Sequence, residues 1–309
     1  MLGVVAILAL GAFALALPPW LISIGTISIS SGLVVLGLIV LWRAGLVPFG
    51  QALYFAAGAY GVALTARWTG ATDAFLLIAI GALAAGILAF LVGFLLARYR
   101  EIFFAMLSLA LSMILYGTLV KSEALGSTDG FNVAPSTFFG YAPRGLAQTQ
   151  ALFWVSLGLV LVAGTIIQAY FGSVVGSLAI PIRDNEIRVE YLGMSVTRII
   201  HLKLVIAGTL AGAGGALAAL AISHVDPNMA YWTTSGGFVF VTILAGAGSV
   251  PGAFIGALVF EGIRTYAVSA LPGAWQMILG SVLLATILFL PEGLASLARR
   301  RGPAKGAVQ

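Results

Sequence analysis

Apolar runs long enough to cross a bilayer occupy most of this chain of 309 residues. A transmembrane helix needs roughly 20 predominantly apolar residues. The sequence offers such runs at 2–19, 22–42, 46–66, 74–97, 102–120, 151–170, 201–222, 236–250, 251–270 and 274–291. Only 8% of the residues are charged and 61% are hydrophobic, whereas soluble domains have about 25% charged residues. We therefore predict an all-α polytopic membrane protein, one transmembrane domain over residues 1–309 with about ten transmembrane helices.

The sequence also excludes several kinds of chemistry. It has no cysteine, and therefore no disulfide, thiolate or Cys-based metal site. It contains neither a G-x-x-x-x-G-K-[ST] nucleotide-binding loop nor an H-E-x-x-H metal site, and His201 and His224 stand at opposite ends of one apolar run. We predict no catalytic residue, no metal site, no cofactor bound by this chain and no nucleic-acid partner. The amino terminus lacks the basic segment of a secretory signal, so residues 2–17 are interpreted as a retained span.

One region between two apolar runs gathers seven of the 25 charged residues. This charged island contains Arg183, Asp184, Glu186, Arg188, Glu190, Arg198 and Lys203. Both flanking runs, 151–170 and 201–222, can cross a bilayer, so the island must lie in water. A structured charged loop at a membrane surface is a place where a soluble partner docks. The island therefore indicates a protein that moves a solute across a membrane and is driven by another protein.

The orientation follows from the loop charges, because cytoplasmic loops carry an excess of Lys and Arg. If the island is cytoplasmic, an even number of spans places both termini in the cytoplasm and eleven of the 15 basic residues on that side. These eleven are Arg43, Arg98, Arg100, Arg183, Arg188, Arg198, Lys203, Arg299, Arg300, Arg301 and Lys305. The prediction gives an external loop at 121–150, a cytoplasmic coupling loop at 171–200 and a basic cytoplasmic tail at 295–309.

Within the island, the sequence predicts a helix of about two turns at 185–192. Asp184 is a suitable N-cap, and Glu186 places negative charge in the first turn, where it suits the helix dipole. Gly193 is a suitable residue for ending the helix.

The predicted helix carries an apolar stripe, since Ile187 and Tyr191 stand four residues apart on one face. Charged residues, namely Glu186, Arg188 and Glu190, flank this stripe. It could dock in a groove of a soluble protein or rest on lipid headgroups. Three acidic residues against two nearby basic ones argue against an anionic lipid surface, and we favour docking.

Two glycine-rich segments, 45–61 and 236–256, interrupt apolar runs. If the chain consists of two five-span halves, these segments occupy corresponding spans, and the odd number per half makes the repeat inverted. Interrupted segments at corresponding positions point to a transport pathway; close helix packing is the alternative explanation. The residues that we assign to the pathway are Pro48, Phe49, Gln51, Tyr54, Gly246 and Gly248.

Glu261 and Arg264 lie three residues apart within the run 251–270, so we expect them to pair. Ionisable residues inside a membrane are functional candidates, but a pair that neutralises itself is more often structural. Glu261 is the residue on which an alternative function depends, namely an ion-coupled secondary transporter of amino acids or other small polar solutes.

The island resembles a known coupling loop. The run Arg183-Asp184-Asn185-Glu186, followed by Glu190 and Gly193, is similar to the R-D-N-E-x-A-A-E-A-L-G-I-N loop of permeases of the branched-chain amino acid ABC importer family. Further matches to the family, over about residues 30 to 295, are Phe104-Ala105-Met106-Leu107, Thr128-Asp129-Gly130, Leu244-Ala245-Gly246-Ala247-Gly248-Ser249 and Pro291-Glu292-Gly293-Leu294. The first two resemble the M-type subunit. Pro48 and Gln51 depart from the family, which commonly has serine and histidine there.

The resemblance implies a permease subunit of an ATP-driven importer, in a bacterial or archaeal inner membrane, for leucine, isoleucine and valine or a related small amide. It implies two cytoplasmic ATPase subunits, a homologous H-type permease and a substrate-binding protein as partners, in addition to membrane lipids. The implied ATPase-coupling residues are Arg183, Asp184, Asn185, Glu186, Ile187, Arg188, Glu190, Tyr191 and Gly193.

Overall fold

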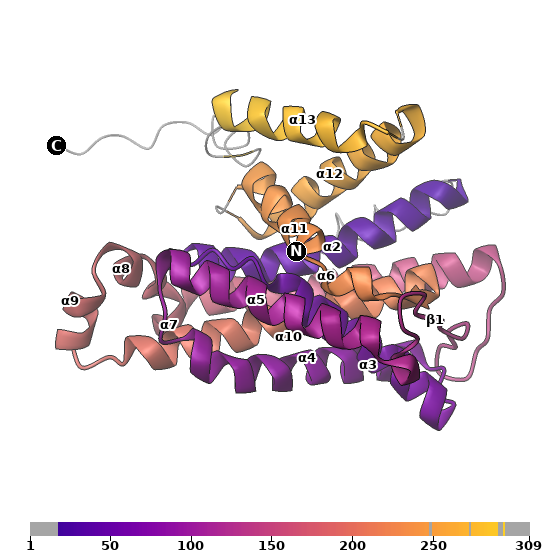
Figure 1. The fold of residues 1–309 in the computed structure, drawn as a ribbon, viewed down its shortest axis with the longest axis horizontal. Coiled ribbons are helices and arrows are strands. Elements are labelled where there is room, and N and C mark those ends of the chain that lie inside the picture. Colours follow the sequence, from indigo (N-terminus) through magenta and orange to yellow (C-terminus); the bar gives the residue numbers. More distant parts are fainter. Residues whose placement is uncertain (1–17, 247–248, 272, 290–292, 294–309) are drawn as a thin grey trace.

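The computed structural model describes residues 18–246, 249–271, 273–289 and 293. In these residues the chain folds into helices and one short two-stranded ladder (Figure 1). The helices are α2 Pro19–Trp42, α3 Gln51–Thr69, α4 Ala74–Leu96, α5 Glu101–Lys121, η1 Glu123–Leu125, α6 Leu146–Gly172, α7 Val174–Ser177, α8 Ala179–Asp184, α9 Glu186–Tyr191, α10 Val196–Ile222, η2 Pro227–Ala230, α11 Trp232–Ala245, α12 Val250–Ala270 and α13 Trp275–Phe289. The strands β1 Phe131–Asn132 and β2 His224–Val225 pair antiparallel.

Six of these helices are long and apolar enough to cross a membrane, namely α2, α4, α5, α6, α10 and α12. Three more of the predicted runs form α3, α11 and α13. The helices α11 and α13 have 14 and 15 residues, about 21 and 22 Å at 1.5 Å per residue, which is shorter than a bilayer core of about 30 Å. The predicted run 2–19 lies almost wholly outside the described residues. The predicted number of about ten spans therefore stays a prediction, and six helices of the described chain have the length that spanning requires.

The helix α10 is the centre of the bundle and packs against α2, α3 and α4. Small residues on α10, from Ala211 to Ala219, are buried and let neighbouring backbones approach closely. A methyl group at Gly215 would overlap the carbonyl oxygen of Phe55 on α3, so this contact requires glycine. The core is thus built by close backbone packing, as expected for helices that associate within lipid.

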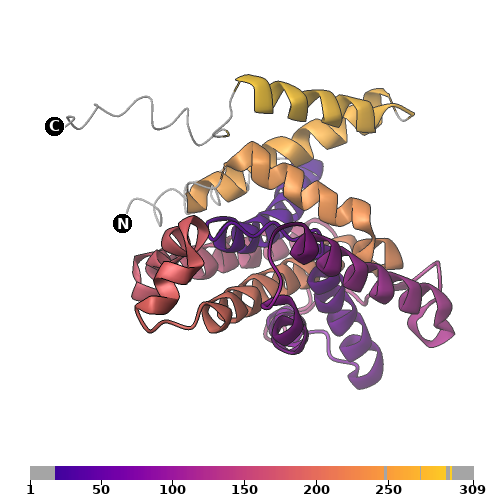
Figure 2. The same cartoon turned by 60° about the vertical axis from the view of Figure 1, so that its left-hand side comes forward.

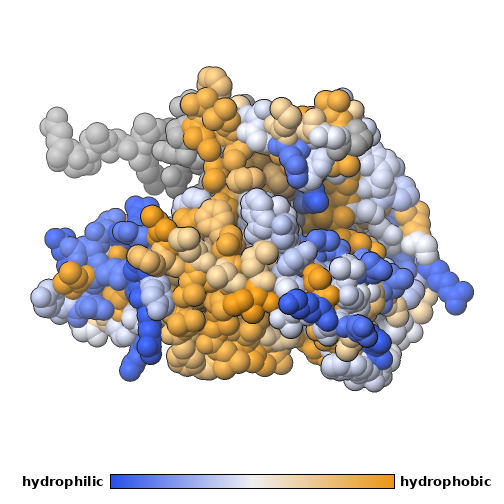
Figure 3. Space-filling model, viewed as in Figure 1, coloured by the Kyte–Doolittle hydropathy of each residue, from blue (hydrophilic) through white to orange (hydrophobic). Residues whose placement is uncertain are grey.

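The two ends of the bundle differ in structure and composition. The short helices α7, α8 and α9 form one end, called here the α9 end (Figure 1). The other end holds η1 and the β1–β2 ladder and is called the ladder end. A band of hydrophobic surface separates polar surfaces at the two ends (Figure 3).

The helices α11, α12 and α13 form the C-terminal part of the fold, with α13 lying to one side of the main bundle (Figures 1 and 2). The helix α12 packs on α2, and Ser31 of α2 donates a hydrogen bond to Glu261 at 3.2 Å. The predicted pair is confirmed: Arg264 lies 3.5 Å from Glu261. The buried carboxylate therefore has two partners, one on its own helix and one on α2.

Candidate functional site

The chain between α6 and α10 forms three short helices; the charged island begins in α8 and runs through α9 into α10, and α9 is the helix expected from the sequence. It covers Glu186–Tyr191, within the predicted 185–192. The predicted N-cap is wrong: Asp184 is the last residue of α8, and the Oδ1 atom of Asn185 accepts a hydrogen bond from the Arg188 N–H at 3.0 Å. Either residue type can cap a helix, and the end of α8 at Asp184 decides which one does. Gly193 follows the helix with φ +83°, the conformation expected at its end.

Two buried apolar side chains fix α8 and α9 to the ends of the long helices. Ile182 and Val189 are 1% and 2% exposed. They belong to a cluster with residues from α2, α4, α5 and α10, including Leu41, Leu96, Phe104 and Ile200. Because these side chains are shared, α9 is packed onto the helices of the membrane bundle and is not a free loop.

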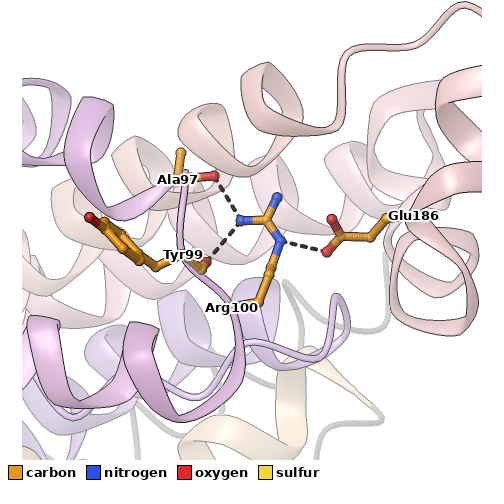
Figure 4. A network of polar contacts seen from close by, with 4 residues as sticks. All are labelled: Ala97, Tyr99, Arg100 and Glu186. Atoms are coloured by element: carbon orange, nitrogen blue, oxygen red, sulfur yellow. Dashed lines mark hydrogen bonds and ion pairs between the residues drawn. The ribbon is translucent and has the colours of Figure 1, made fainter.

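Arg100 adds a polar connection between α9 and the turn that joins α4 to α5 (Figure 4). Its Nε atom lies 2.5 Å from Glu186, and its guanidinium also donates to the carbonyl oxygens of Ala97 and Tyr99 at 2.7 and 2.8 Å. An arginine that contacts three acceptors at once is held in one geometry. Arg100 thus ties the first turn of α9 to two long helices.

The opposite face of α9 is exposed and apolar. Ile187, Tyr191 and Leu192 are 64%, 88% and 76% exposed. Arg188 and Glu190 are exposed beside them, and Arg183 lies 3.6 Å from Asp184 in an exposed pair. An apolar face rimmed by charges is suited to a protein groove. The structure also adds Leu192, which the sequence reasoning left out of this face.

The polypeptide is not helical where it enters the bundle before α3. Residues 43–50 are not helical, and α3 starts at Gln51 instead of the predicted 46. The Phe49 N–H donates to Ser108 Oγ at 3.1 Å, and a methyl group at Gly50 would overlap the Ser108 carbonyl oxygen. Ser108 lies seven residues, about 10 Å, from the start of α5. The break before α3 therefore lies well inside the bundle, not at its end.

A second interruption of helical structure lies before α11. The segment that contains it enters the bundle from the ladder end. The strand β2 and the short helix η2 lead from the ladder end to α11. Ser112 donates to the carbonyl oxygen of Ala230, the last residue of η2, at 2.8 Å, and Ser112 lies nine residues, about 14 Å, from the ladder end of α5. The Ala52 N–H of α3 donates to Ser235 of α11 at 2.9 Å. The two broken segments thus meet inside the bundle.

Two polar side chains in the first turn of α3 are buried without a hydrogen-bond partner among the described residues, Gln51 next to this meeting point and Tyr54 with its ring against Gly208 of α10. They are the Gln51 amide, in which neither Oε1 nor Nε2 has a partner, and the Tyr54 hydroxyl. Gln51 is 0% exposed and Tyr54 2%. A buried polar atom without a partner costs about 1–3 kcal/mol. Unpaired buried groups of this kind, next to two interrupted helices, favour a site that receives a polar solute.

The other predicted pathway residues are divided between two places. Pro48 is buried and Phe49 partly buried just before α3, near Gln51. Gly246 caps the far end of α11 with φ +78°, a whole helix away from Ser235 at its start. Gly248 lies outside the described residues. Gly246 therefore does not belong to the meeting point, because α11 is a continuous helix between the two positions.

The meeting point includes three serines that the sequence reasoning missed. Ser108, Ser112 and Ser235 are all buried, and each makes a hydrogen bond to one of the broken segments. Ser108 and Ser112 stand four residues apart on one face of an apolar helix. That spacing was the signal that could have identified them.

Basic residues are unequally distributed between the two ends. Of the eleven Lys and Arg residues in the described parts, six are at the α9 end, three are at the ladder end and two, Lys203 and Arg264, lie within α10 and α12. Those at the ladder end are Arg67, Lys121 and Arg144.

Comparison with known proteins gives consistent matches over most of the chain. The family described as "Branched-chain amino acid transport system / permease component" matches residues 20–288. The chain is 25% identical to the high-affinity branched-chain amino acid transport system permease protein LivM of Escherichia coli K12, over 93% of this chain and 75% of LivM. It is 24% identical to the permease protein LivH of the same organism, over 73% of this chain and 76% of LivH. No solved structure matches.

Proposed function

Since the chain belongs to the branched-chain amino acid transport system permease family, we propose that it is the subunit through which an ATP-driven importer moves leucine, isoleucine and valine, or a related small amide, across the membrane. The observation that carries the proposal is the way in which α9 is attached to the membrane bundle. Its buried residue Val189 belongs to an apolar cluster with residues at the ends of four long helices, and its other face is apolar and exposed. A partner that pulls or pushes on α9 therefore acts directly on the membrane bundle.

The partners follow from this role. Two cytoplasmic ATPase subunits hydrolyse ATP, and one of them docks on the exposed face of α9. A second, homologous permease of the LivH type pairs with this chain, and a binding protein delivers the solute at the ladder end. The relatives in E. coli, LivM and LivH, are both named as permease proteins of one transport system, which supports a pair of unlike permeases.

The proposed location is a bacterial or archaeal inner membrane, with the α9 end and both termini in the cytoplasm and about ten spans in two inverted halves. The excess of basic residues at the α9 end supports this orientation. The two broken segments, which reach the centre of α5 from opposite ends, support the inverted halves.

The transported solute passes the meeting point of α3 and α11. The Gln51 amide offers a donor and an acceptor without any fixed charge. The neighbouring serines are also neutral. A path without charges suits a solute that is neutral overall, such as a zwitterionic amino acid or an amide.

An ion-coupled secondary transporter needs a titrating or ion-binding group within the membrane. Glu261 and Lys203 are buried titratable side chains in the described spans; Glu261 is engaged by Arg264 and Ser31, and Lys203 donates to the Tyr170 hydroxyl at 3.0 Å. No observation therefore favours this second function.

Charge reversal at Glu190 tests the docking role of α9. Glu190 is exposed and precedes Tyr191 of the apolar face in the chain, so Glu190→Lys should leave the bundle folded while disturbing the contact with the ATPase. We expect uptake by proteoliposomes containing the assembled transporter to fall at least about tenfold, with ATP hydrolysis no longer coupled to it. Arg98→Glu, an exposed charge reversal at the same end outside α9, is the matched control.

Two results would contradict the proposal. If Glu190→Lys transporters assemble and transport normally, α9 is not the docking element. If the purified chain transports leucine without any added ATPase, it is not a subunit of an ATP-driven importer.

A further inference from the structure

A cavity of about 450 Å³ opens at the ladder end, between the last turns of α3, the short helix η1 and the strand β1. Its volume lies in the range of about 300–1,000 Å³ that is typical of small-molecule sites. The walls that matter for recognition are formed by Ala63, Ala66, Arg67, Glu123, Phe131 and Asn132.

The cavity presents two opposite charges that do not pair with each other. Arg67 is held in place by the Ala124 carbonyl oxygen, at 3.3 Å from its guanidinium nitrogen, and by the Phe131 ring, 5.5 Å from its guanidinium carbon. Glu123 is exposed and has no cation within ion-pair distance in the part of the chain that the structure describes. A guanidinium and a carboxylate that face one cavity separately offer one site for a carboxylate and one for an ammonium group.

The cavity also has an apolar wall. Ala63 and Ala66 stand on the inward side of α3, and Phe131 faces them from β1. Such a wall has room for an aliphatic side chain and no polar group that would reject it. The combination of two separated charges and an aliphatic wall is complementary to an amino acid with an aliphatic side chain.

We propose that this cavity is a loading site for a zwitterionic aliphatic amino acid, with the carboxylate on Arg67, the ammonium on Glu123 and the side chain against Ala63, Ala66 and Phe131. The choice of solute rests on the proposed transport function. The site differs in chemistry from the meeting point of α3 and α11, which is neutral. A solute released at the ladder end is therefore first held by its charged groups, and then passes a region without charges.

Two structural connections lead from the cavity to the meeting point. The helix α3 contributes Arg67 at its outer end and Gln51 at its inner end, 16 residues or about 24 Å apart. The strand β1 pairs with β2, with Phe131 opposite Val225, and the chain continues from β2 through η2 to α11. A solute in the cavity thus contacts α3 directly, and it contacts β1, which is paired with the strand that leads to α11.

Equilibrium dialysis of radiolabelled L-leucine against the purified, assembled transporter, without binding protein, tests the site. We expect saturable binding, and we expect Arg67→Gln and Glu123→Gln each to weaken it at least about tenfold, since each removes a charged partner. Arg144→Gln and Asp129→Asn remove exposed charges at the same end that do not line the cavity, and should bind as the unmodified protein does.

Two leucine analogues separate the roles of the two charges. Leucinamide lacks the carboxylate and should therefore bind more weakly than leucine. Arg67→Gln should not weaken the binding of leucinamide further. The carboxylic acid 4-methylpentanoate lacks the ammonium group and should be insensitive to Glu123→Gln. A merely structural role of either residue would weaken leucine and both analogues together, and would overturn the assignment.

The proposal is wrong if leucine shows no saturable binding up to about 10 mM, or if both variants bind leucine normally. If these variants bind leucine normally and bind the binding protein less well, the cavity is a docking site for that protein instead. In each of these cases the proposed function still holds if the transporter with its binding protein takes up leucine at an unchanged rate. Absence of any branched-chain amino acid uptake refutes the proposed function itself.

Discussion

Gln51 combines two properties that ordinary packing residues do not have. Its side chain is 0% exposed, and both atoms of its amide lack a hydrogen-bond partner within the described residues. For folding alone, an apolar side chain of similar size would be the better choice at this position. The proposed transport path accounts for the glutamine, because a passing polar solute would supply partners for its amide.

A substitution can separate these two contributions. Gln51→Leu removes two unpaired polar atoms, so we expect the thermal unfolding temperature of the purified protein to stay the same or rise. Uptake of leucine should nevertheless fall at least about tenfold, because the solute loses its amide partner. The control is Gln168→Leu, an exposed glutamine on α6, which should alter neither property. A Gln51→Leu protein that is clearly less stable, or that transports normally, would contradict this role.

Among the elements, α9 shows how a helix of only two turns can be held rigidly. A helix this short is unstable in isolation, because its nucleation costs more than its few hydrogen bonds return. The cap by Asn185, the burial of Val189 and the contact between Arg100 and Glu186 stabilise it in place. Only with such fixed contacts can a force on its exposed face reach α4 and α5.

The contact between Arg100 and Glu186 contributes measurably to the stability of α9. Both side chains are about one-third exposed or less, so their coupling energy should be about 1 kcal/mol. We expect Arg100→Ala and Glu186→Gln each to speed amide hydrogen exchange of α9 about fivefold, and the double variant to add little more. Arg98→Ala, an exposed neighbour without a partner in the described structure, should leave this exchange unchanged. Additive effects of the two substitutions would show that the pair is not coupled.

The same elements show what can be read from the sequence. The charged island, the helix within it and the glycine at its end follow from local chemistry, and all three are present. The cap was assigned to Asp184, because the sequence alone does not reveal that α8 extends to that residue. The contact between Ala52 and Ser235 joins residues that are far apart in the chain, and no local pattern predicts it. The start of α3 at Gln51 likewise depends on packing of residues 46–50 against α5.

At the scale of the whole molecule, charge is distributed along the long axis of the bundle. Six basic residues at the α9 end and three at the ladder end, separated by a hydrophobic band, describe a protein that lies in a bilayer with its ends in water (Figure 3). The proposed docking face and the proposed loading cavity then lie on opposite sides of the membrane.

The absence of cysteine allows a direct measurement of this sidedness. Ser195→Cys places one thiol at the α9 end and Thr128→Cys one at the ladder end, both at exposed positions. In intact cells we expect a membrane-impermeant maleimide to label the second variant and not the first, which should react only after the membrane is opened. Labelling of Ser195→Cys from outside would reverse the proposed orientation.

The pairing of β1 with β2 also has a consequence for how the protein is made. Asn132 and its partner His224 are 92 residues apart in the chain. At a synthesis rate of about 5–20 residues per second, β1 leaves the ribosome roughly 5–20 s before β2 exists. Throughout that interval the polypeptide between α5 and α6 has no strand to pair with, although α4 and α5 are already complete. Pairing of β1 with β2 at the ladder end therefore has to wait until all of α10 has been synthesised, because β2 follows α10 directly in the chain.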